Sequence, residues 1–359
     1  GRLSTSNLIW MSKIKANFYP VGERSEITKN SIEILSSCGY LENKKGYYDR
    51  KTGKSRQARM RGASKLIDMI AKACVDPIHQ RMIEREVEKP ILLRDEWKQE
   101  IDFSYNRKLK DMRANVNKIN SYLALQNIEF LPSFSTKKEM GEDQVYMPNL
   151  RRNNLVRIFN ETFDRGGRFY RHWAQSLPSK YRKYININGQ NVTEIDYCSI
   201  HPYILYAWEG LPLPEGDVYS LDGEDLDCPD NRKICKKILL VIFNVNSTED
   251  PAQVVISELN KERFPGVNKH FIETLISKLK EKHTPISDYS ASGVGLQLQR
   301  YDSDLAEKIM LRLKDKDIPC LPIHDSFIVP EKNEQELRYA MVEEAEALIG
   351  QTPRIEKKY

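Results

Sequence analysis

Two stretches of the chain have the pattern of buried strands, one by alternation of apolar and polar residues and one as an apolar run, and each carries one aspartate. The stretch Val192–Tyr197 brings Asp196 to the end of a predicted strand, just before a turn and an apolar helical segment. In Leu321–Val329, Asp325 lies within an apolar run, beside His324. A lone carboxylate before a helix is usually a helix cap. Two carboxylates on buried strands far apart in sequence instead indicate a site for two metal ions in phosphoryl transfer.

Further apolar patterns place a hairpin and several helices around these strands. A hairpin is predicted from 184–189 and 192–197, turning at Asn188-Gly189, because this residue pair is typical of two-residue turns. Apolar residues at helical spacing predict helices at 151–163, 232–243, 256–282, 299–314 and 334–348. Strands and helices in this order indicate an α+β fold for residues 149–359, which we expect to form the catalytic domain.

Residues 1–80 have the pattern of a small separate module. Helices are predicted at 25–37 and 63–73, and two short strands at 40–48 and 56–61. Helix, basic hairpin and helix is the order of a winged-helix unit, which contacts either nucleic acid or another protein. On the first alternative, the residues of the hairpin that would meet a phosphate backbone are Arg50, Lys54, Arg56 and Arg59.

Residues 81–148 are expected to connect the two domains. From 85 to 127 the chain is strongly charged, with an apolar stripe close to helical spacing, which predicts a long helix or a helical pair as a scaffold or thumb-like segment. Residues 131–148 have the pattern of a linker loop, with Pro132 and Pro148 near its ends. We assign no chemistry to this part.

Composition excludes several classes of protein. Charged residues make up 30% and hydrophobic residues 40% of the chain, and no apolar run approaches the ~20 residues needed to cross a bilayer. The beginning of the sequence lacks the pattern of a signal peptide. The six cysteines are scattered without a Cys-x-x-Cys pair, which argues against a zinc site or a disulfide framework. We therefore expect a cytoplasmic protein without membrane contact.

The distribution of charged residues along the chain indicates possible binding partners better than the net charge of +5 does. Residues 165–183 combine six basic residues with four aromatic side chains, one of them a tryptophan, and contain no acidic residue. Basic residues mixed with aromatic ones suit a phosphate backbone with stackable bases. The alternative interpretation is a solvated basic surface.

Several segments resemble one family, in the same order along the chain. Asp196-Tyr-Cys-Ser-Ile-His201 resembles motif A of the family-A DNA polymerases and of the single-subunit phage and mitochondrial RNA polymerases. His324-Asp325-Ser-Phe resembles motif C, in the form closer to the RNA polymerases. Arg232-Lys-Ile-Cys-Lys236 resembles motif B of the fingers helix. Three shorter matches lie at 164–170, 216–219 and 299–305.

The resemblance implies a polymerase palm with short helical fingers. Asp196 and Asp325 would bind two Mg²⁺ ions, with Mn²⁺ as a substitute, and the backbone carbonyl of Tyr197 would add a ligand. Arg232 and Lys236 would grip the incoming triphosphate, since four residues is the helical spacing that puts both side chains on one face. The other implied contacts are His201 and Phe243 to the nucleotide, and Arg168, Tyr170, Gln299 and His324 to the nucleic acid.

We therefore predict template-directed nucleotidyl transfer, making short RNA on a DNA rather than an RNA template. The chain would serve as a primase or minimal RNA polymerase of a phage, plasmid or other mobile element in a bacterial cytoplasm. Nucleoside triphosphates would be its substrates, and a helicase or another replication protein its partner.

Three alternatives stay open. A small DNA polymerase of the same fold is the first, because family-A DNA polymerases carry at the position of His201 a glutamate that rejects the ribose 2′-hydroxyl. A replication initiator with an inactive palm, binding DNA through the basic hairpin, is the second. A metal-dependent nuclease is the third, because Glu194 lies on the same strand face as Asp196.

Overall fold

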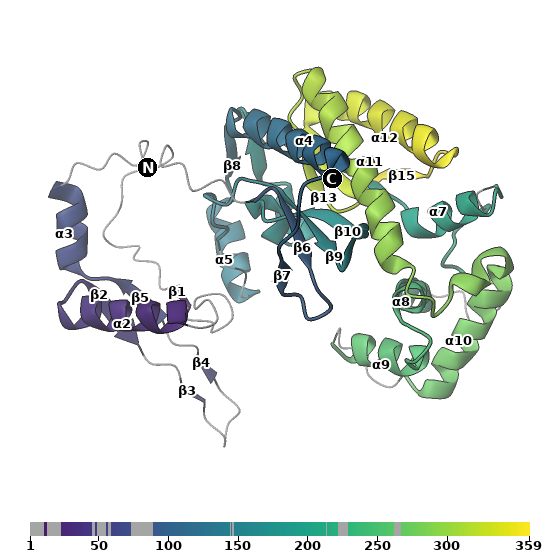
Figure 1. Ribbon diagram of the computed structural model, residues 1–359, viewed down its shortest axis with the longest axis horizontal. Coiled ribbons are helices and arrows are strands. Elements are labelled where there is room, and N and C mark those ends of the chain that lie inside the picture. Colours follow the sequence, from purple (N-terminus) through teal and green to yellow (C-terminus); the bar gives the residue numbers. More distant parts are fainter. Residues whose placement is uncertain are drawn as a thin grey trace. The chain divides into compact units, whose positions relative to one another are not determined.

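The computed structural model describes residues 11–12, 23–44, 47–48, 55–56, 59–72, 89–143, 145, 147–212, 214–221, 229–261 and 267–359 (Figure 1). The chain divides into two compact units, Gly1–Arg85 and Glu86–Tyr359. Each unit is described by itself below.

The first unit joins two helices to a small sheet. Helix α2 (Glu23–Ser37) ends at Gly39, whose left-handed φ of 77° lets the amide of Tyr40 donate to the carbonyl of Leu35 at 2.9 Å. The sheet has the order β1-β5-β2, and β3 pairs with β4 in a separate hairpin. The helix–hairpin–helix order predicted from the sequence is present, whereas a winged-helix identity stays a prediction. The strands are β1 (Met11–Ser12), β2 (Leu41–Lys44), β3 (Tyr47–Tyr48), β4 (Ser55–Arg56) and β5 (Arg59–Gly62), followed by helix α3 (Ser64–Lys72).

The second unit is organised around a six-stranded sheet with the order β13-β14-β12-β11-β8, in which β15 also pairs with β12. All of its pairs are antiparallel. The predicted turn at Asn188-Gly189 joins β11 to β12, and both residues have positive φ, 52° and 79°. The strands are β8 (Ile128–Phe130), β11 (Ile185–Ile187), β12 (Gln190–Tyr197), β13 (Leu321–Ile323), β14 (Ser326–Pro330) and β15 (Ile355–Lys357).

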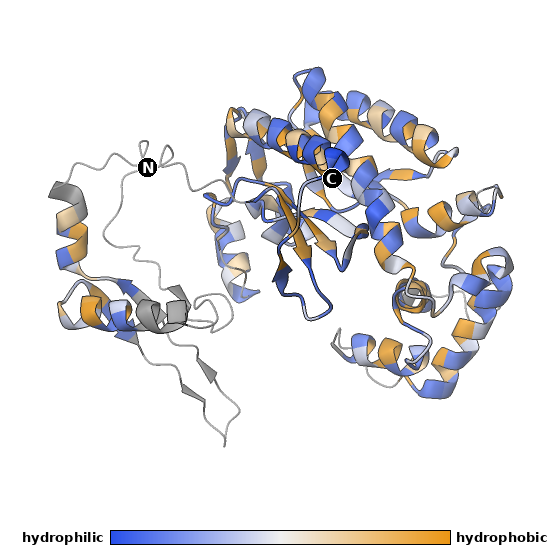
Figure 2. Cartoon of the chain, viewed as in Figure 1, coloured by the Kyte–Doolittle hydropathy of each residue, from blue (hydrophilic) through white to orange (hydrophobic). Residues whose placement is uncertain are grey.

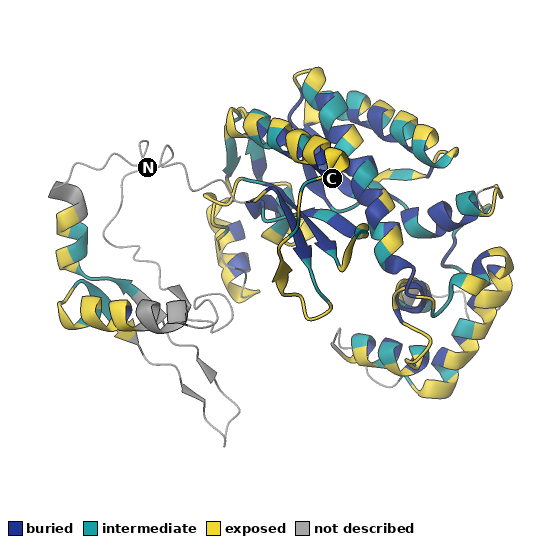
Figure 3. Cartoon of the chain, viewed as in Figure 1, coloured by how far each residue is buried: buried dark blue, intermediate teal, exposed yellow. Residues whose placement is uncertain are grey.

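A smaller sheet lies beside it, with the order β10-β9-β6-β7 and a parallel pairing of β6 with β9. Figure 2 shows apolar residues along β6 and β9, and Figure 3 shows the same strands buried. At Gly167 in β10, φ is 83° and an added Cβ would lie 2.5 Å from the ring of Phe159, so only glycine fits there. The strands are β6 (Ile91–Arg94), β7 (Glu100–Ile101), β9 (Val156–Asn160) and β10 (Thr162–Tyr170).

Helices cover these sheets. Helix α11 (Gly295–Asp315) packs against β10, α12 (Glu334–Ile349) and α4 (Arg107–Ala124). Residues of β12, β14, α11 and α12 all belong to the largest hydrophobic core. The shorter helical segments are α5 (Phe134–Glu142), η2 (Trp173–Ser176), α6 (Ser179–Arg182) and η4 (Glu331–Asn333).

A group of helices between β12 and α11 in sequence forms the predicted helical insertion. It comprises α7 (Ile200–Trp208), α8 (Pro229–Asn244), α9 (Pro251–Lys261), α10 (Lys269–Lys282) and η3 (Thr284–Tyr289). Figure 1 shows α8, α9 and α10 gathered near the beginning of α11. The predicted α+β class, an antiparallel sheet with helices and a short helical insertion, is confirmed.

Three local predictions are wrong. The segment predicted as a helix at 151–163 holds strand β9, because its apolar residues are buried on both faces and such a strand has no clear alternation. The charged segment 85–127 contains the β6–β7 hairpin before α4. The predicted linker 131–148 contains α5, whose cap Ser133 accepts a hydrogen bond from the amide of Thr136 at 3.1 Å. No helix in the described part of the chain is long and apolar enough to cross a bilayer.

Candidate active site

Asp196 and Asp325 meet at one end of the sheet. Strands β12 and β14 are antiparallel neighbours with Asp196 opposite Ser326, and the amide of Tyr197 donates to the carbonyl of Asp325 at 3.2 Å. Two residues near the aspartates, Ser199 and His324, have left-handed φ values of 61° and 60°. Non-glycine residues in this region store backbone strain, which is common at functional sites. Pairing of the strands therefore brings together two carboxylates that are far apart in sequence.

The carboxylate of Asp196 is mostly buried and only partly compensated. Its Oδ2 lies 3.0 Å from Nζ of Lys358, while its Oδ1 is buried without a hydrogen-bond partner. Burial and, next, the negative charge of Asp325 raise the pKa of Asp196 to about 6, against the opposing effect of Lys358. A partnerless buried oxygen beside a second carboxylate fits a divalent cation, which prefers oxygen ligands. Tyr197 could contribute only its carbonyl, since its ring is buried and its hydroxyl donates to the carbonyl of Met341.

The third carboxylate on this face, Glu194, has a different environment. It is fully buried, and its Oε1 lies 2.8 Å from both Nη1 of Arg182 and Oγ of Ser326. Nζ of Lys358 is 3.4 Å from the same oxygen. Among the residues that the structure describes, no three or more His, Cys, Asp or Glu side chains are grouped to hold a metal ion. Glu194 is thus neutralised by cations, which disfavours the denser carboxylate cluster of a nuclease.

A buried carboxylate that sequence reasoning missed, Asp302 of α11, connects two predicted site residues. Asp302 is 3% exposed; its Oδ2 lies 3.0 Å from Nε of Arg168 and 2.8 Å from Nε2 of His201. Burial alone would raise the pKa of Asp302, but the hydrogen bond from His201 and the charge of Arg168 outweigh it and lower the pKa. The sequence did carry a signal, because Asp302 interrupts the apolar stripe formed by Leu298, Leu305 and Ile309.

His324 and Tyr170 lie near the positive charge of Arg168. Their ring centroids are 5.6 Å apart in an edge-on arrangement. Burial, reinforced by the positive charge of Arg168, lowers the pKa of His324, so its imidazole is neutral near pH 7. Its Nδ1 is buried and has no partner within the described residues. Arg168, Tyr170, His201 and His324 therefore form one group beside the two aspartates.

The two predicted triphosphate contacts share one face of α8, as their spacing implies. The guanidinium of Arg232 and the ammonium of Lys236 lie 5.6 Å and 5.7 Å from the ring centroid of Tyr219. Arg232 also pairs with Asp217. Burial raises the pKa of Tyr219 to about 12, and its phenol interacts with Ser199 and with the charge of Asp325. Tyr219 thus connects the cationic face of α8 to the aspartates.

The end of α10 holds the segment around Tyr219 in place. Nζ of Lys282 donates to the carbonyls of Asp217 and Ser220 at 2.8 Å and 2.7 Å. Nε2 of His283 donates to the carbonyl of Val218 at 2.8 Å, so its Nδ1 must accept from the hydroxyl of Tyr206, 3.0 Å away. These bonds fix the end of α10 to α7 and to the segment around Tyr219.

The structure describes the remaining predicted residues only in part. Phe243 is 3% exposed and packs in the core, so its ring is inaccessible to a base in this structure. Gln299 lies half-buried on α11. Arg50 and Lys54 are outside the described residues, and the structure describes only the backbone of Arg56 and Arg59.

Much of the basic and aromatic run at 165–183 is buried or paired within the protein. Phe169, Trp173 and Tyr181 are buried in the core. Four of its six cations form ion pairs: Arg165 with Glu161, Arg168 with Asp302, Lys180 with Glu139, and Arg182 with Glu194. Apart from Glu161, these acidic partners lie 12 or more positions away in the sequence, where a local reading of charge overlooks them.

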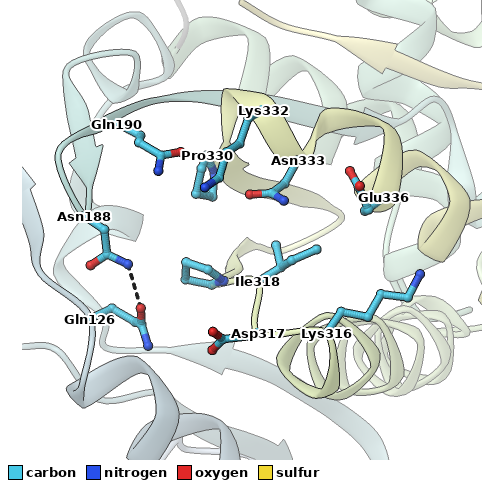
Figure 4. A pocket seen from close by; sticks show the side chains of 11 residues that line it. Gln126, Asn188, Gln190, Lys316, Asp317, Ile318, Pro330, Lys332, Asn333 and Glu336 are labelled. Atoms are coloured by element: carbon cyan, nitrogen blue, oxygen red, sulfur yellow. Dashed lines mark hydrogen bonds between the residues drawn. The ribbon is translucent and has the colours of Figure 1, made fainter.

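A separate polar pocket lies at the opposite end of β12 and β14 (Figure 4). It has a volume of about 550 Å³, and Gln190 and Pro330, the last residues of the strands at that end, line it together with Lys316 and Lys332. Asp196 lies six positions further along β12 than Gln190, which corresponds to a distance of about 20 Å. The pocket is therefore not part of the candidate active site.

Comparisons with known proteins leave the family of this chain open. No family model matches it, and no curated protein matches it. Among solved structures, it is similar to the POL domain of Pol1 from M. smegmatis in complex with DNA primer-template and dNTP, with 12% identity and a TM-score of 0.41. The match covers 82% of this chain and 64% of that structure, less than two thirds of its length. At this TM-score the likeness supports no conclusion about function, so the function is inferred from the residues of the site alone.

Proposed function

We propose that this chain is a template-directed nucleotidyltransferase whose catalytic carboxylates are Asp196 and Asp325. The observation that carries the proposal is their meeting where the end of β12 lies beside the turn before β14, with a buried, partnerless oxygen on Asp196. The proximity of an exposed arginine and lysine on one helix face adds a site for a polyphosphate. Acidic residues for metal ions and basic residues for phosphates are the two requirements of this reaction.

The aspartates and the basic residues of α8 have different roles in this reaction. Two Mg²⁺ ions held by Asp196 and Asp325 would activate the attacking hydroxyl and neutralise the leaving pyrophosphate. Arg232 and Lys236 pair with the phosphates of the nucleotide and stabilise the charge that develops there. To reach them, Arg232 exchanges Asp217 for the triphosphate, since both compete for the same guanidinium.

We propose ribonucleotides as substrates and short RNA as the product. The residue where family-A DNA polymerases carry a glutamate is His201, and here Asp302 holds its imidazole by accepting a hydrogen bond from Nε2. An imidazole fixed in this way presents no carboxylate to a ribose 2′-hydroxyl. The template would be single-stranded DNA, contacted by the group of Arg168, Tyr170 and His324.

Incorporation of labelled nucleotides on single-stranded DNA with Mg²⁺ tests the proposal. All-ribo and all-deoxy pools are compared, with and without a primer, for the wild type, Asp196→Asn and Asp325→Asn. Asp315→Asn is the matched control, because Asp315 is an exposed carboxylate at the end of α11 whose partner is its neighbour Lys314. We expect short ribonucleotide products that are lost in both site variants and kept in the control.

Other outcomes would decide between the alternatives. Primer-dependent products from deoxyribonucleotides alone would establish a small DNA polymerase and refute the choice of sugar. Tight DNA binding without any product would refute the enzyme and favour an initiator with an inactive palm.

A further inference from the structure

Strand β15 brings a lysine to the aspartate pair. It pairs antiparallel with β12, with Ile195 opposite Lys357, and the next amide, that of Lys358, donates to the carbonyl of Glu194 at 2.9 Å. The side chain of Lys358 points to the aspartates: its Nζ is 3.0 Å from Oδ2 of Asp196 and 3.4 Å from Oε1 of Glu194. No pattern in the sequence marks this residue.

The environment of Lys358 differs from that of a surface ion pair. Its side chain is 34% exposed, Asp196 is 22% exposed and Glu194 is fully buried. The negative charges of Asp196, Glu194 and Asp325 all act on its ammonium. The preceding residue, Lys357, faces the other way and pairs with Glu334 at 2.8 Å, because successive side chains of a strand alternate. Ladder pairing, not side-chain flexibility, thus determines which lysine reaches the site.

We propose that Lys358 is a positioning residue of the metal centre, a built-in cation that holds Oδ2 of Asp196. The lysine leaves Oδ1, the buried oxygen without a partner, as the metal ligand. Its positive charge also opposes a divalent cation beside the same carboxylate. Metal binding is therefore weak in the free protein and strengthens when the phosphates of a nucleotide bring their own negative charge. This inference rests on the function proposed above.

The test is the affinity of the full chain for Mn²⁺ without nucleotide, followed by the electron paramagnetic resonance signal of free Mn²⁺. The variants are Lys358→Met, Lys358→Arg and, as the matched control, Lys357→Met. Measurement at pH 8.5 keeps Asp196 ionised, since its pKa is about 6. Removal of one nearby positive charge should tighten Mn²⁺ binding roughly fivefold in Lys358→Met. Lys358→Arg and Lys357→Met should bind Mn²⁺ as the wild type does.

The nucleotide gives a second readout that a merely structural role would not affect. Adding a non-hydrolysable nucleoside triphosphate should tighten Mn²⁺ binding more in the wild type than in Lys358→Met, where the opposing charge is already gone. An affinity in Lys358→Met equal to or weaker than that of the wild type overturns the inference. An equal gain in Lys357→Met also overturns it, because the effect would then follow from net charge alone.

Two further variants separate this inference from the proposed function. Asp196→Asn and Asp325→Asn should each abolish Mn²⁺ binding, both without and with the nucleotide. If both bind Mn²⁺ as the wild type does, or if the wild type binds none, the metal centre itself is refuted and the inference with it. If both lose Mn²⁺ while Lys358→Met matches the wild type, the metal centre stands and only the role of Lys358 is refuted.

Discussion

We expect Asp302, the buried carboxylate between Arg168 and His201, to contribute both to the stability of the protein and to its choice of nucleotide. In Asp302→Asn the side chain keeps its shape but loses its charge, and Arg168, 17% exposed, is left without its counter-ion. Removing one partner of a buried ion pair costs about 3–5 kcal/mol. The amide oxygen still accepts a hydrogen bond, so we expect the free energy of unfolding to fall by about 3 kcal/mol. Urea denaturation measures this loss.

The functional effect of the same change separates positioning from stability. In Asp302→Asn, one uncharged amide oxygen is left for both Arg168 and His201, so the imidazole of His201 is held less firmly. Discrimination between ribo- and deoxyribonucleotides should then fall at least tenfold, which corresponds to about 1.4 kcal/mol of differential binding. Incorporation of each pool at saturating Mg²⁺ gives the ratio.

A second buried ion pair on the same helix provides the control. Oε2 of Glu307 lies 2.7 Å from Nη1 of the fully buried Arg157, and the hydrogen bonds described for the side chain of Arg157 go to Gly167, Ser303, Asp304 and Glu307, not to Arg168, Tyr170, His201 or His324. Glu307→Gln should therefore lower stability without changing the ratio of ribo- to deoxyribonucleotide incorporation. A ratio that stays at the wild-type value in Asp302→Asn, or that changes equally in Glu307→Gln, would refute the positioning role.

Three other predictions address the metal site, the phosphate site and the fold. The pKa of Asp196 is raised to about 6 in the metal-free folded protein, so between pH 4 and pH 6 the folded protein keeps a proton that the unfolded chain has released. The contribution of Asp196 to the free energy of unfolding should therefore fall by up to about 3 kcal/mol as pH rises from about 4 to about 6. Denaturation of the wild type and Asp196→Asn at several pH values measures this loss, and parallel dependences of stability on pH in the two proteins would contradict it. Arg232→Ala and Lys236→Ala should each raise the KM for nucleotide about tenfold, because each loses one charge-assisted contact to the phosphates. The control Lys233→Ala, at another position of α8, should leave the KM unchanged. Steady-state kinetics measures these values, and an equal rise in all three variants would argue against a phosphate site. Gly167→Ala should destabilise the protein by about 3 kcal/mol, because its Cβ would lie 2.5 Å from the ring of Phe159 at a φ of 83°; a thermal midpoint equal to that of the wild type would contradict the packing of β10.

In some segments, the pattern of neighbouring residues was not enough to predict the structure. Strand β9 was predicted as a helix because burial on both faces removed the alternation that marks a strand. The run at 165–183 was predicted as a nucleic-acid surface, but Arg168 and Arg182 face buried carboxylates, Asp302 and Glu194, that lie elsewhere in the sequence. Phe243 carries the apolar character of a base-stacking ring and of a core residue alike, and burial decides for the core.

The sequence by itself determined features that depend on neighbouring residues. Alternation placed Asp196 on a strand, the Asn188-Gly189 pair specified the turn before β12, and four-residue spacing put Arg232 and Lys236 on one face of α8. Asp325, which was also expected on a strand, lies in the turn between β13 and β14. Each follows from backbone geometry, which repeats over two to four residues.

Only the tertiary structure decided which distant groups meet. The pairing of β12 with β14 brings the two aspartates together, β15 adds Lys358, and the packing of α11 on β10 places Asp302 between Arg168 and His201. These contacts join residues about 100 or more positions apart, and they form because burying the apolar faces of strands and helices selects one arrangement of the elements. The charged groups then lie where that packing carries them, and no local pattern records their partners.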